Sequence, residues 1–383
     1  MPSTGATQAL PNPYEPRYGW ASPALAKQHA QAELEAQESA VLPGYVSTYA
    51  GSGQYGHNDG LLNACEFLQP ISLTFGPDGT LFVVERRHRV RTISPQGIVT
   101  LYAGCNQHGY EDGPRLDAKF FRPTGIVADQ NGNVLVCDSS NNCVRLLNTS
   151  TDLVETYAGA NTAGFLDGTL QKARFNSPHS IAISRSGDLF VTDNLNQAIR
   201  YINVAEKTVS TLLCGFQFKN QINTHIRFNL WGPEGIAVLP NDDIIFVDGS
   251  TMGRIHRIDM ATREIQPFVM NSSESVAAKP KYVSGNPYGG QNGRPRNQAA
   301  IPPVPAPDQA AKPDTPSEFC LPSAVCVSPQ GDIFVSESGI NSILKNTSPG
   351  SRVMENFAGE GMRGAKNGAR EVATFNFPQG LAI

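Results

Sequence analysis

The chain has 383 residues, of which 17% are charged and 40% are apolar, and its formal net charge at pH 7 is -4. This composition is typical of a globular protein and provides no bulk attraction for phosphate, so nucleic acid is not the default partner. The seven cysteines are odd in number, scattered and never in a CxxC pair. Their spacing indicates neither a disulfide framework nor a zinc site, and we expect reduced thiols.

Residues 1–43 are predicted to form an N-terminal arm with a short helix. The first twenty residues are rich in turn formers, Ser22-Pro23 has the form of an N-cap followed by a first-turn proline, and an Ala-rich helix-forming segment follows. The first thirty residues lack the pattern of a secretory signal, and no 18 apolar residues run together. We therefore expect a cytoplasmic protein, with a cytoskeletal or ciliary assembly as an option, and no membrane partner.

A repeat runs through the chain from residue 70 onward. Its copies open at Pro70, Pro123, Pro178, Pro233 and Pro322, at spacings of 53, 55, 55 and 89 residues, with a further opening at Pro378. Each copy holds three short apolar, β-branched-rich runs and a fourth that ends in Ala-Gly or a near variant. Four short strands per unit are typical of a propeller blade, so the sequence predicts an all-β propeller.

Two turn motifs punctuate the repeats. The first two strands of each unit are separated by residues that tolerate positive φ, which predicts hairpins at Asp78-Gly79, Asn131-Gly132, Ser186-Gly187, Asn241-Asp242 and Gln330-Gly331. A second motif lies between units: Asp-Gly or Asn-Gly, a small residue six positions on, a phenylalanine eight positions on, and the opening proline at offset eleven. Its copies begin at Asp59, Asp112, Asp167 and Asn367. A turn, a small residue and an aromatic predict close packing of adjacent blades.

These elements, P-x-G-I-A, L-F-V-x-D-x-x-N-x-x-I-R and V-x-T-x-A-G, resemble the NHL repeat family over about residues 46–383. The resemblance implies blades of four antiparallel strands around a central channel, commonly six in number. It does not imply one function, because the family includes RNA-binding and protein-binding modules, extracellular adhesion propellers and related lyases.

The predicted propeller domain, residues 44–383, departs from a regular ring in two ways. A Pro-rich insertion at 271–321 cannot bury a core and is expected to be an irregular loop, with its IPPVPAP segment as an alternative docking peptide. Residues 45–51 match only the last strand of a blade, and residues 378–383 match only the first. We therefore expect a six-bladed-type propeller of five complete blades, with residues 45–50 and 380–383 sharing an incomplete closing blade. Since open edges are a liability, we expect the natural chain to continue past Ile383 or a partner to cover the gap.

The residues after the opening prolines are candidates for lining the channel: Ile71, Thr124, His179, Glu234, Ser323 and Gln379. The segment around His179, PHSIA, resembles the P-H-x-[IL]-A openings of peptidylglycine α-amidating lyases, whose histidines bind zinc. A catalytic zinc needs three protein ligands, and this set offers one histidine with Glu234 as a second candidate. We therefore expect no metal or cofactor, and a metal-dependent lyase or hydrolase remains an alternative.

An acid follows the second strand of every unit: Glu85, Asp138, Asp193, Asp248 and Glu337. Recurrence at one repeat position predicts a structural task, such as bonding the backbone of the following loop, and no single blade carries a cluster that would indicate catalysis. We therefore expect a protein that is not an enzyme.

Arg86, Arg87 and Arg89 form a candidate basic surface within the segment ERRHRVR. The equivalent segments SSNNCVR and NLNQAIR offer one arginine each, whereas a phosphate-binding face needs charge from several blades. RNA binding is therefore the weaker alternative. The favoured prediction is a non-catalytic scaffold that binds protein partners within an intracellular assembly.

Overall fold

The computed structural model describes residues 44–215, 226–227, 230–249, 254–270 and 319–383. Residues 46–383 group into one compact unit. The predicted arm and helix at 1–43 and most of the predicted insertion at 271–321 lie outside the described residues, so both remain predictions. In the part that the structure describes, the regular elements are β-strands and two short 3-10 helices, η1 (Ser139–Asn141) and η2 (Asn194–Asn196).

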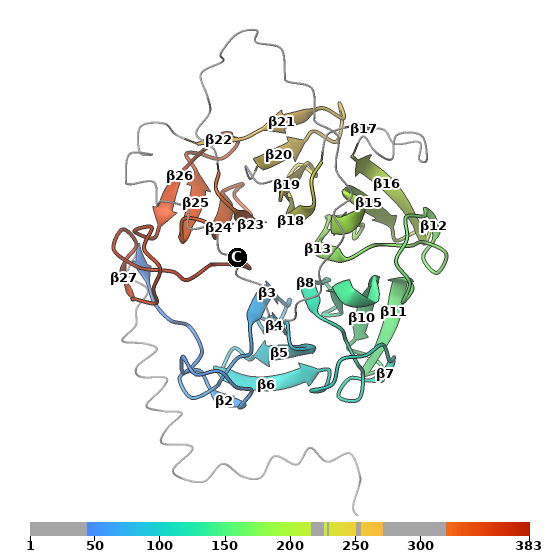
Figure 1. The fold of residues 1–383 in the computed structure, drawn as a ribbon, viewed down its shortest axis with the longest axis horizontal. Helices are drawn as coiled ribbons and strands as arrows, with labels where there is room; N and C mark the ends of the chain where they lie inside the picture. The colour runs from blue at the N-terminus through green and yellow to red at the C-terminus, as the bar shows by residue number, and fades with distance from the viewer. Residues whose placement is uncertain (1–43, 216–225, 228–229, 250–253, 271–318) are drawn as a thin grey trace, which may run out of the picture. The chain divides into compact units, whose positions relative to one another are not determined.

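Five blades surround a common axis, each a set of antiparallel strands stepping outward from it (Figure 1). Blade 1 contains β3 (Pro70–Phe75), β4 (Leu81–Glu85), β5 (Arg89–Ile93) and β6 (Ile98–Ala103). Blade 2 contains β8 (Pro123–Ala128), β9 (Val134–Asp138), β10 (Cys143–Asn148) and β11 (Leu153–Gly159). Blade 3 contains β13 (Pro178–Ile183), β14 (Leu189–Asp193), β15 (Ala198–Asn203) and β16 (Thr208–Cys214). Blade 4 contains β18 (Pro233–Val238), β19 (Ile244–Asp248), β20 (Arg254–Ile258) and β21 (Ile265–Pro267). Blade 5 contains β23 (Pro322–Val327), β24 (Ile333–Glu337), β25 (Ser342–Asn346) and β26 (Val353–Ala358).

Short strands from the segments between blades extend the outer edges. The glycine of the Asp-Gly motif begins β2 (Gly60–Leu61), β7 (Gly113–Pro114) and β12 (Gly168–Thr169), which pair antiparallel with the outermost strands of blades 1, 2 and 3. Two further strands, β17 (Ile226–Arg227) and β22 (Val269–Met270), pair in parallel with β16 and β26. These additions cover backbone groups that an edge strand would otherwise leave open.

The predicted hairpins are confirmed. The turn residues Gly79, Gly132, Gly187 and Gly331 have φ between +79 and +89°, and Asp242 takes the same role in blade 4 at +65°. Five of the opening prolines begin an innermost strand, as predicted. The hairpins are therefore local features that the residue types at each turn specify.

Most of the hydrophobic core lies between neighbouring blades. One cluster joins Leu135 and Val144 of blade 2 to Ile181 and Leu189 of blade 3, and similar clusters bridge blades 1 and 2, 3 and 4, and 4 and 5. The small residues of the inter-blade motif, Cys65, Ala118, Ala173 and Ala373, are each 0% exposed. The predicted packing role of this motif is thus confirmed.

The sixth position of the ring holds fragments in place of a blade. β1 (Tyr45–Val46) pairs with β27 (Gly368–Ala369), so β1 takes the place of an outermost strand, and the Thr48 hydroxyl bonds to Asn367 nearby. Residues 378–383 form no strand. The two segments expected to share the closing blade both lie at the sixth position, but they do not pair with each other, because β1 pairs with the strand of the inter-blade motif.

Ring contacts at the sixth position are made along the axis. The carbonyls of Pro378 and Gln379 accept bonds from the hydroxyls of Ser338 and Ser336 in blade 5. On the other side, a Cβ at Gly380 would lie 2.7 Å from the Cα of Ser72 in blade 1. Residues 378–380 therefore bridge blades 5 and 1 at the place where an inner strand would begin.

Candidate functional site at the propeller axis

The inner strands begin around a small axial cavity. It has a volume of about 50 Å³ and is lined by Ile71, Ser72, Arg86, Thr124, Gly125, His179, Ser180, Gly235, Ser323, Ala324, Gln379 and Gly380. Five of the six candidate channel residues, Ile71, Thr124, His179, Ser323 and Gln379, thus line one space. The volume leaves room for a few water molecules or a small ion, and it is far below the several hundred Å³ of a typical pocket for an organic ligand.

Hydroxyl groups tie neighbouring blades together around this cavity. Thr124 donates to the carbonyl of His179 at 2.6 Å, and Thr192 donates to the carbonyl of Glu234 at 2.8 Å. Within blade 5, the hydroxyl of Ser323 lies 2.6 Å from that of Ser338, which donates to the carbonyl of Pro378 at the sixth position. These bonds use the side chains to satisfy backbone carbonyls at the blade openings, which is a structural task.

Three ionisable groups act on one another at the axis. Burial, together with the charge of Arg86, lowers the pKa of His179 to about 4. Burial also raises the pKa of Glu234 to about 7, and Arg86 partly offsets that rise. The Nδ1 atom of His179 has no hydrogen-bond partner among the described residues. The arrangement can hold water and bind a proton near neutral pH at Glu234.

The residues at the axis do not fit a catalytic zinc. Such a site requires three protein ligands and an open position. In the part of the chain that the structure describes, no three His, Cys, Asp or Glu side chains come close enough to share a metal ion. His179 and Glu234 supply at most two ligands, so no metal-dependent step can be derived for this cavity.

The predicted basic surface is not a surface cluster. Arg86 lines the axial cavity, and Arg89 is 2% exposed because it forms an ion pair with Glu85 at 2.8 Å and bonds to Asn106. Only Arg87 is exposed. Arg89 is buried because it lies on β5, a middle strand that packs on both faces. The sequence does distinguish Arg86, because the residues at the equivalent position of the other blades carry no charge: Ser139, Asn194, Gly249 and Ser338.

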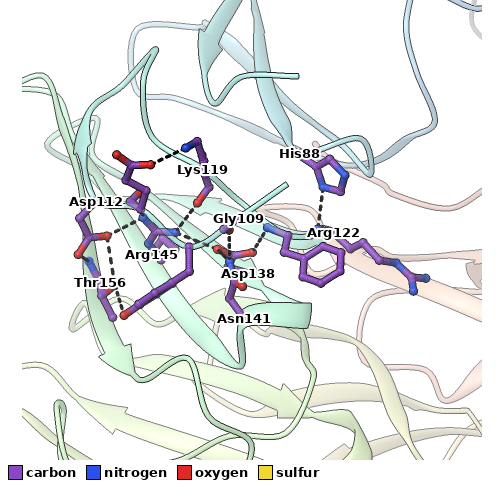
Figure 2. A network of polar contacts seen from close by, with 12 residues as sticks. His88, Gly109, Asp112, Lys119, Arg122, Asp138, Asn141, Arg145 and Thr156 are labelled. Carbon is purple, nitrogen blue, oxygen red and sulfur yellow. Dashed lines mark hydrogen bonds and ion pairs between the residues drawn. The ribbon is translucent and has the colours of Figure 1, made fainter. Parts of the chain in front are cut away.

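In blades 1, 2 and 3 the recurrent acid belongs to a buried ion-pair network, shown for blade 2 in Figure 2. Asp138 accepts bonds from the backbone N–H of Phe121 at 2.7 Å, from Asn141 at 2.8 Å and from Arg145 at 2.9 Å. The guanidinium of Arg145 is fully buried, reaches Asp112 of the inter-blade motif at 2.5 Å and donates to two backbone carbonyls. The expected structural task is therefore present.

The acid also holds a segment that the prediction did not include. Phe121 precedes the opening proline by two residues, so Asp138 bonds the segment that leads into its own blade, and it bonds the following loop through the side chain of Asn141. The backbone N–H groups of Leu68, Asn176, Trp231 and Leu321 make the same bond in the other blades. Blades 1 and 3 repeat the arginine as well, with Arg91 and Arg200 between two carboxylates each.

Comparison with known proteins agrees with this geometry. The family model of the NHL repeat matches residues 120–145, which run from the aromatic of the inter-blade motif to the buried arginine of β10. The chain is a β-propeller that contains an NHL repeat. This NHL propeller is 29% identical over 202 residues to protein SUPPRESSOR OF QUENCHING 1, chloroplastic, of Arabidopsis thaliana, covering 50% of the chain and 19% of that protein. It is 30% identical over 178 residues to NHL repeat-containing protein 2 of Bos taurus, covering 42% and 24%.

The NHL propeller thus spans about a fifth to a quarter of these curated relatives. A Bacteroides thetaiotaomicron protein of unknown function shares the fold at a TM-score of 0.56 and 15% identity, covering 88% of this chain and 70% of that one. Across the described residues, no helix has the length and apolar character to span a bilayer. The cytoplasmic location remains a prediction, and one relative is named as chloroplastic.

Proposed function

We propose that the protein is a non-catalytic propeller scaffold that binds protein partners on one face. That face, called the proline face here, is the side at which the inner strands begin, marked by Pro70, Pro123, Pro178, Pro233, Pro322 and Pro378. The recurrent acids are engaged inside the blades, and the axial cavity is too small for an organic substrate. Binding is therefore better supported than catalysis.

The observation that carries the proposal is the exposure of large apolar side chains at the seam between blades 3 and 4. Leu195 is 61% exposed and Trp231 is 54% exposed. Their segments adjoin, because the side chain of Asn194 donates to the carbonyl of Pro233 at 3.1 Å. Tryptophan is enriched at the energetic centres of protein interfaces, and exposed apolar patches mark interaction sites.

The experiment compares two double variants of the full chain. Leu195→Ser/Trp231→Ser removes the apolar side chains from the proline face, and Leu116→Ser/Leu166→Ser removes two equally exposed side chains, 56% and 52%, next to β7 and β12 at the outer rim. Proteins captured by proximity labelling in cells are quantified for both, and thermal unfolding confirms that both fold. We expect the first variant to lose a defined set of partners that the second retains. Equal retention by both variants would contradict the proposal.

A further inference from the structure

A second cluster of side chains lies on the proline face at the seam between blades 1 and 2. The His88 and His108 rings have centroids 5.7 Å apart, and both contact Phe121, at 5.9 and 5.0 Å. Arg122 follows Phe121, and Figure 2 shows its backbone N–H pointing at the His88 ring. Arg87 precedes His88 on the connection from β4 to β5. We call Arg87, His88, His108 and Arg122 the seam cluster.

The seam cluster gathers positive charge without a carboxylate of its own. Arg87, His108 and Arg122 are exposed, and His88 is half-buried. Burial lowers the pKa of His88 first, and the charges of His108, Arg87, Arg122 and Arg89 lower it further. Arg89 is already paired with Glu85, whereas Arg87 and Arg122 form no ion pair with any carboxylate in the described part of the chain.

One hydrogen bond fixes how His88 can act. Its Nδ1 atom accepts the backbone N–H of Arg122 at 3.0 Å, so the neutral ring carries its proton on Nε2. In the next seam Asn142 makes the same bond to the N–H of Ser177 at 3.0 Å. His88 therefore keeps the structural bond and presents one donor, Nε2–H, on the far side of its ring, whereas the side-chain amide N–H groups of an asparagine lie closer to its own backbone.

From this geometry we infer that the seam cluster binds a phosphate monoester, carried by a phosphorylated side chain of a protein partner. A phosphorylated side chain brings close to two negative charges and three strong acceptor oxygens. Two guanidinium groups, the Nε2–H of His88 and the His108 ring match that charge and that donor requirement. The identity of the partner as a protein rests on the proposed scaffold function, but the phosphate site does not.

A phosphorylated side chain fits the seam better than a nucleic acid does. The corresponding positions at the next seam are Asn142, Ser177 and Ala163, which carry no charge. The seam cluster therefore provides charge for one phosphate group, whereas a nucleic-acid strand needs phosphate contacts from several blades. The net charge of -4 points the same way.

The test titrates inorganic phosphate, a phosphoserine peptide with its unphosphorylated twin, and an oligouridine into the full chain. Imidazole resonances of His88 and His108 report occupancy by NMR, and calorimetry gives the Kd. Variants are Arg87→Gln/Arg122→Gln, the conservative His88→Asn, and the matched control Arg185→Gln/Arg352→Gln, whose arginines are exposed and outside the seam.

We expect phosphate and the phosphopeptide to shift both imidazoles in the wild type and in the control. The double arginine variant should bind at least about tenfold more weakly, since it removes two groups that donate charge-assisted hydrogen bonds to the phosphate. His88→Asn should weaken binding less. Undiminished phosphate binding in the double variant would overturn the site. If phosphate binds but the phosphopeptide does not, or if oligouridine binds more tightly through the same residues, the assignment of a phosphorylated protein as the partner is overturned. Because the phosphate titration needs no protein partner, its outcome is independent of the capture experiment.

Discussion

Blades 2 and 5 bury a carboxylate at the same place and stabilise it differently. In blade 2, Asp138 faces the guanidinium of Arg145 at 2.9 Å. In blade 5, Glu337 is 1% exposed, but Leu344 stands at the register position of Arg145, and the carboxylate accepts backbone N–H groups only. Burial raises the pKa of both carboxyl groups, to about 7 for Glu337 and to about 6 for Asp138, where the charge of Arg145 partly offsets the rise.

The buried arginine of a blade and the aspartate of the preceding Asp-Gly motif occur together, so the two form one structural unit. Arg91, Arg145 and Arg200 each lie between the acid of their own blade and the aspartate of the preceding Asp-Gly motif. In blade 5 the sequence before the opening proline has no such aspartate, and the arginine is absent too. A guanidinium buried with one carboxylate would leave donors unsatisfied, so loss of both partners costs less than loss of one.

The largest effect is expected from breaking the unit in blade 2. Arg145→Leu should lower the free energy of unfolding by about 3 to 5 kcal/mol, because it leaves Asp138 as a buried, uncompensated charge. Urea denaturation at pH 7 measures the loss. Adding Asp112→Asn and Asp138→Asn to the variant should recover part of it.

Leu344→Met in blade 5 is the matched control for Arg145→Leu. It changes the same register position without affecting an ion pair, and should cost less than about 1.5 kcal/mol. If Arg145→Leu cost no more than this control, the buried network would not stabilise blade 2.

A smaller, pH-dependent effect is expected at Glu337. Its folded pKa of about 7 lies above the ordinary 4.5, so its contribution to stability is fully present below pH 4.5 and is lost as the pH rises through 7. Wild type should therefore lose about 2 to 3 kcal/mol relative to Glu337→Gln between pH 5 and 8. Denaturation midpoints of both proteins across this range test it, with Glu360→Gln as an exposed control. A constant difference between wild type and Glu337→Gln would show that Glu337 is ionised throughout.

The smallest effect is expected at the glycines where the outermost strands of blades 2 and 3 end. Gly159 ends blade 2 at φ +88°, and a Cβ there would meet the Phe175 ring at 2.8 Å and a backbone carbonyl at 2.9 Å. Gly159→Ala should cost about 2 kcal/mol from backbone strain and crowding. Gly215, which ends blade 3 and is not followed by an Asp-Gly motif, has no positive φ. A Cβ there would lie 3.0 Å from the side-chain oxygen of Gln197 and 3.3 Å from a backbone carbonyl, which is less crowded than at Gly159. Gly215→Ala should therefore cost less than Gly159→Ala, and equal losses in thermal unfolding would contradict the distinction.

Local spacing in the sequence determined the blades. A proline, a hairpin with a positive-φ residue and a fourth run ending in Ala-Gly specify four strands without reference to the rest of the chain, and five blades follow these signals. The inter-blade motif predicted its own packing for the same reason, since its small residue and its aromatic lie at fixed offsets from the turn. The convergence of Thr124, His179, Ser323 and Gln379 also follows, because equivalent repeat positions meet at the axis of a ring.

Only the tertiary structure decided where the charged side chains go. Arg86, Arg87 and Arg89 are neighbours in sequence, yet one lines the axis, one is exposed and one is buried in an ion pair. The seam cluster needs residues from two blades, and His88 contacts Arg122 across 34 positions. The closing pair of β1 and β27 joins the two ends of the propeller sequence. Burial and partner choice at these places depend on which blade lies alongside, and the ring alone determines that neighbour.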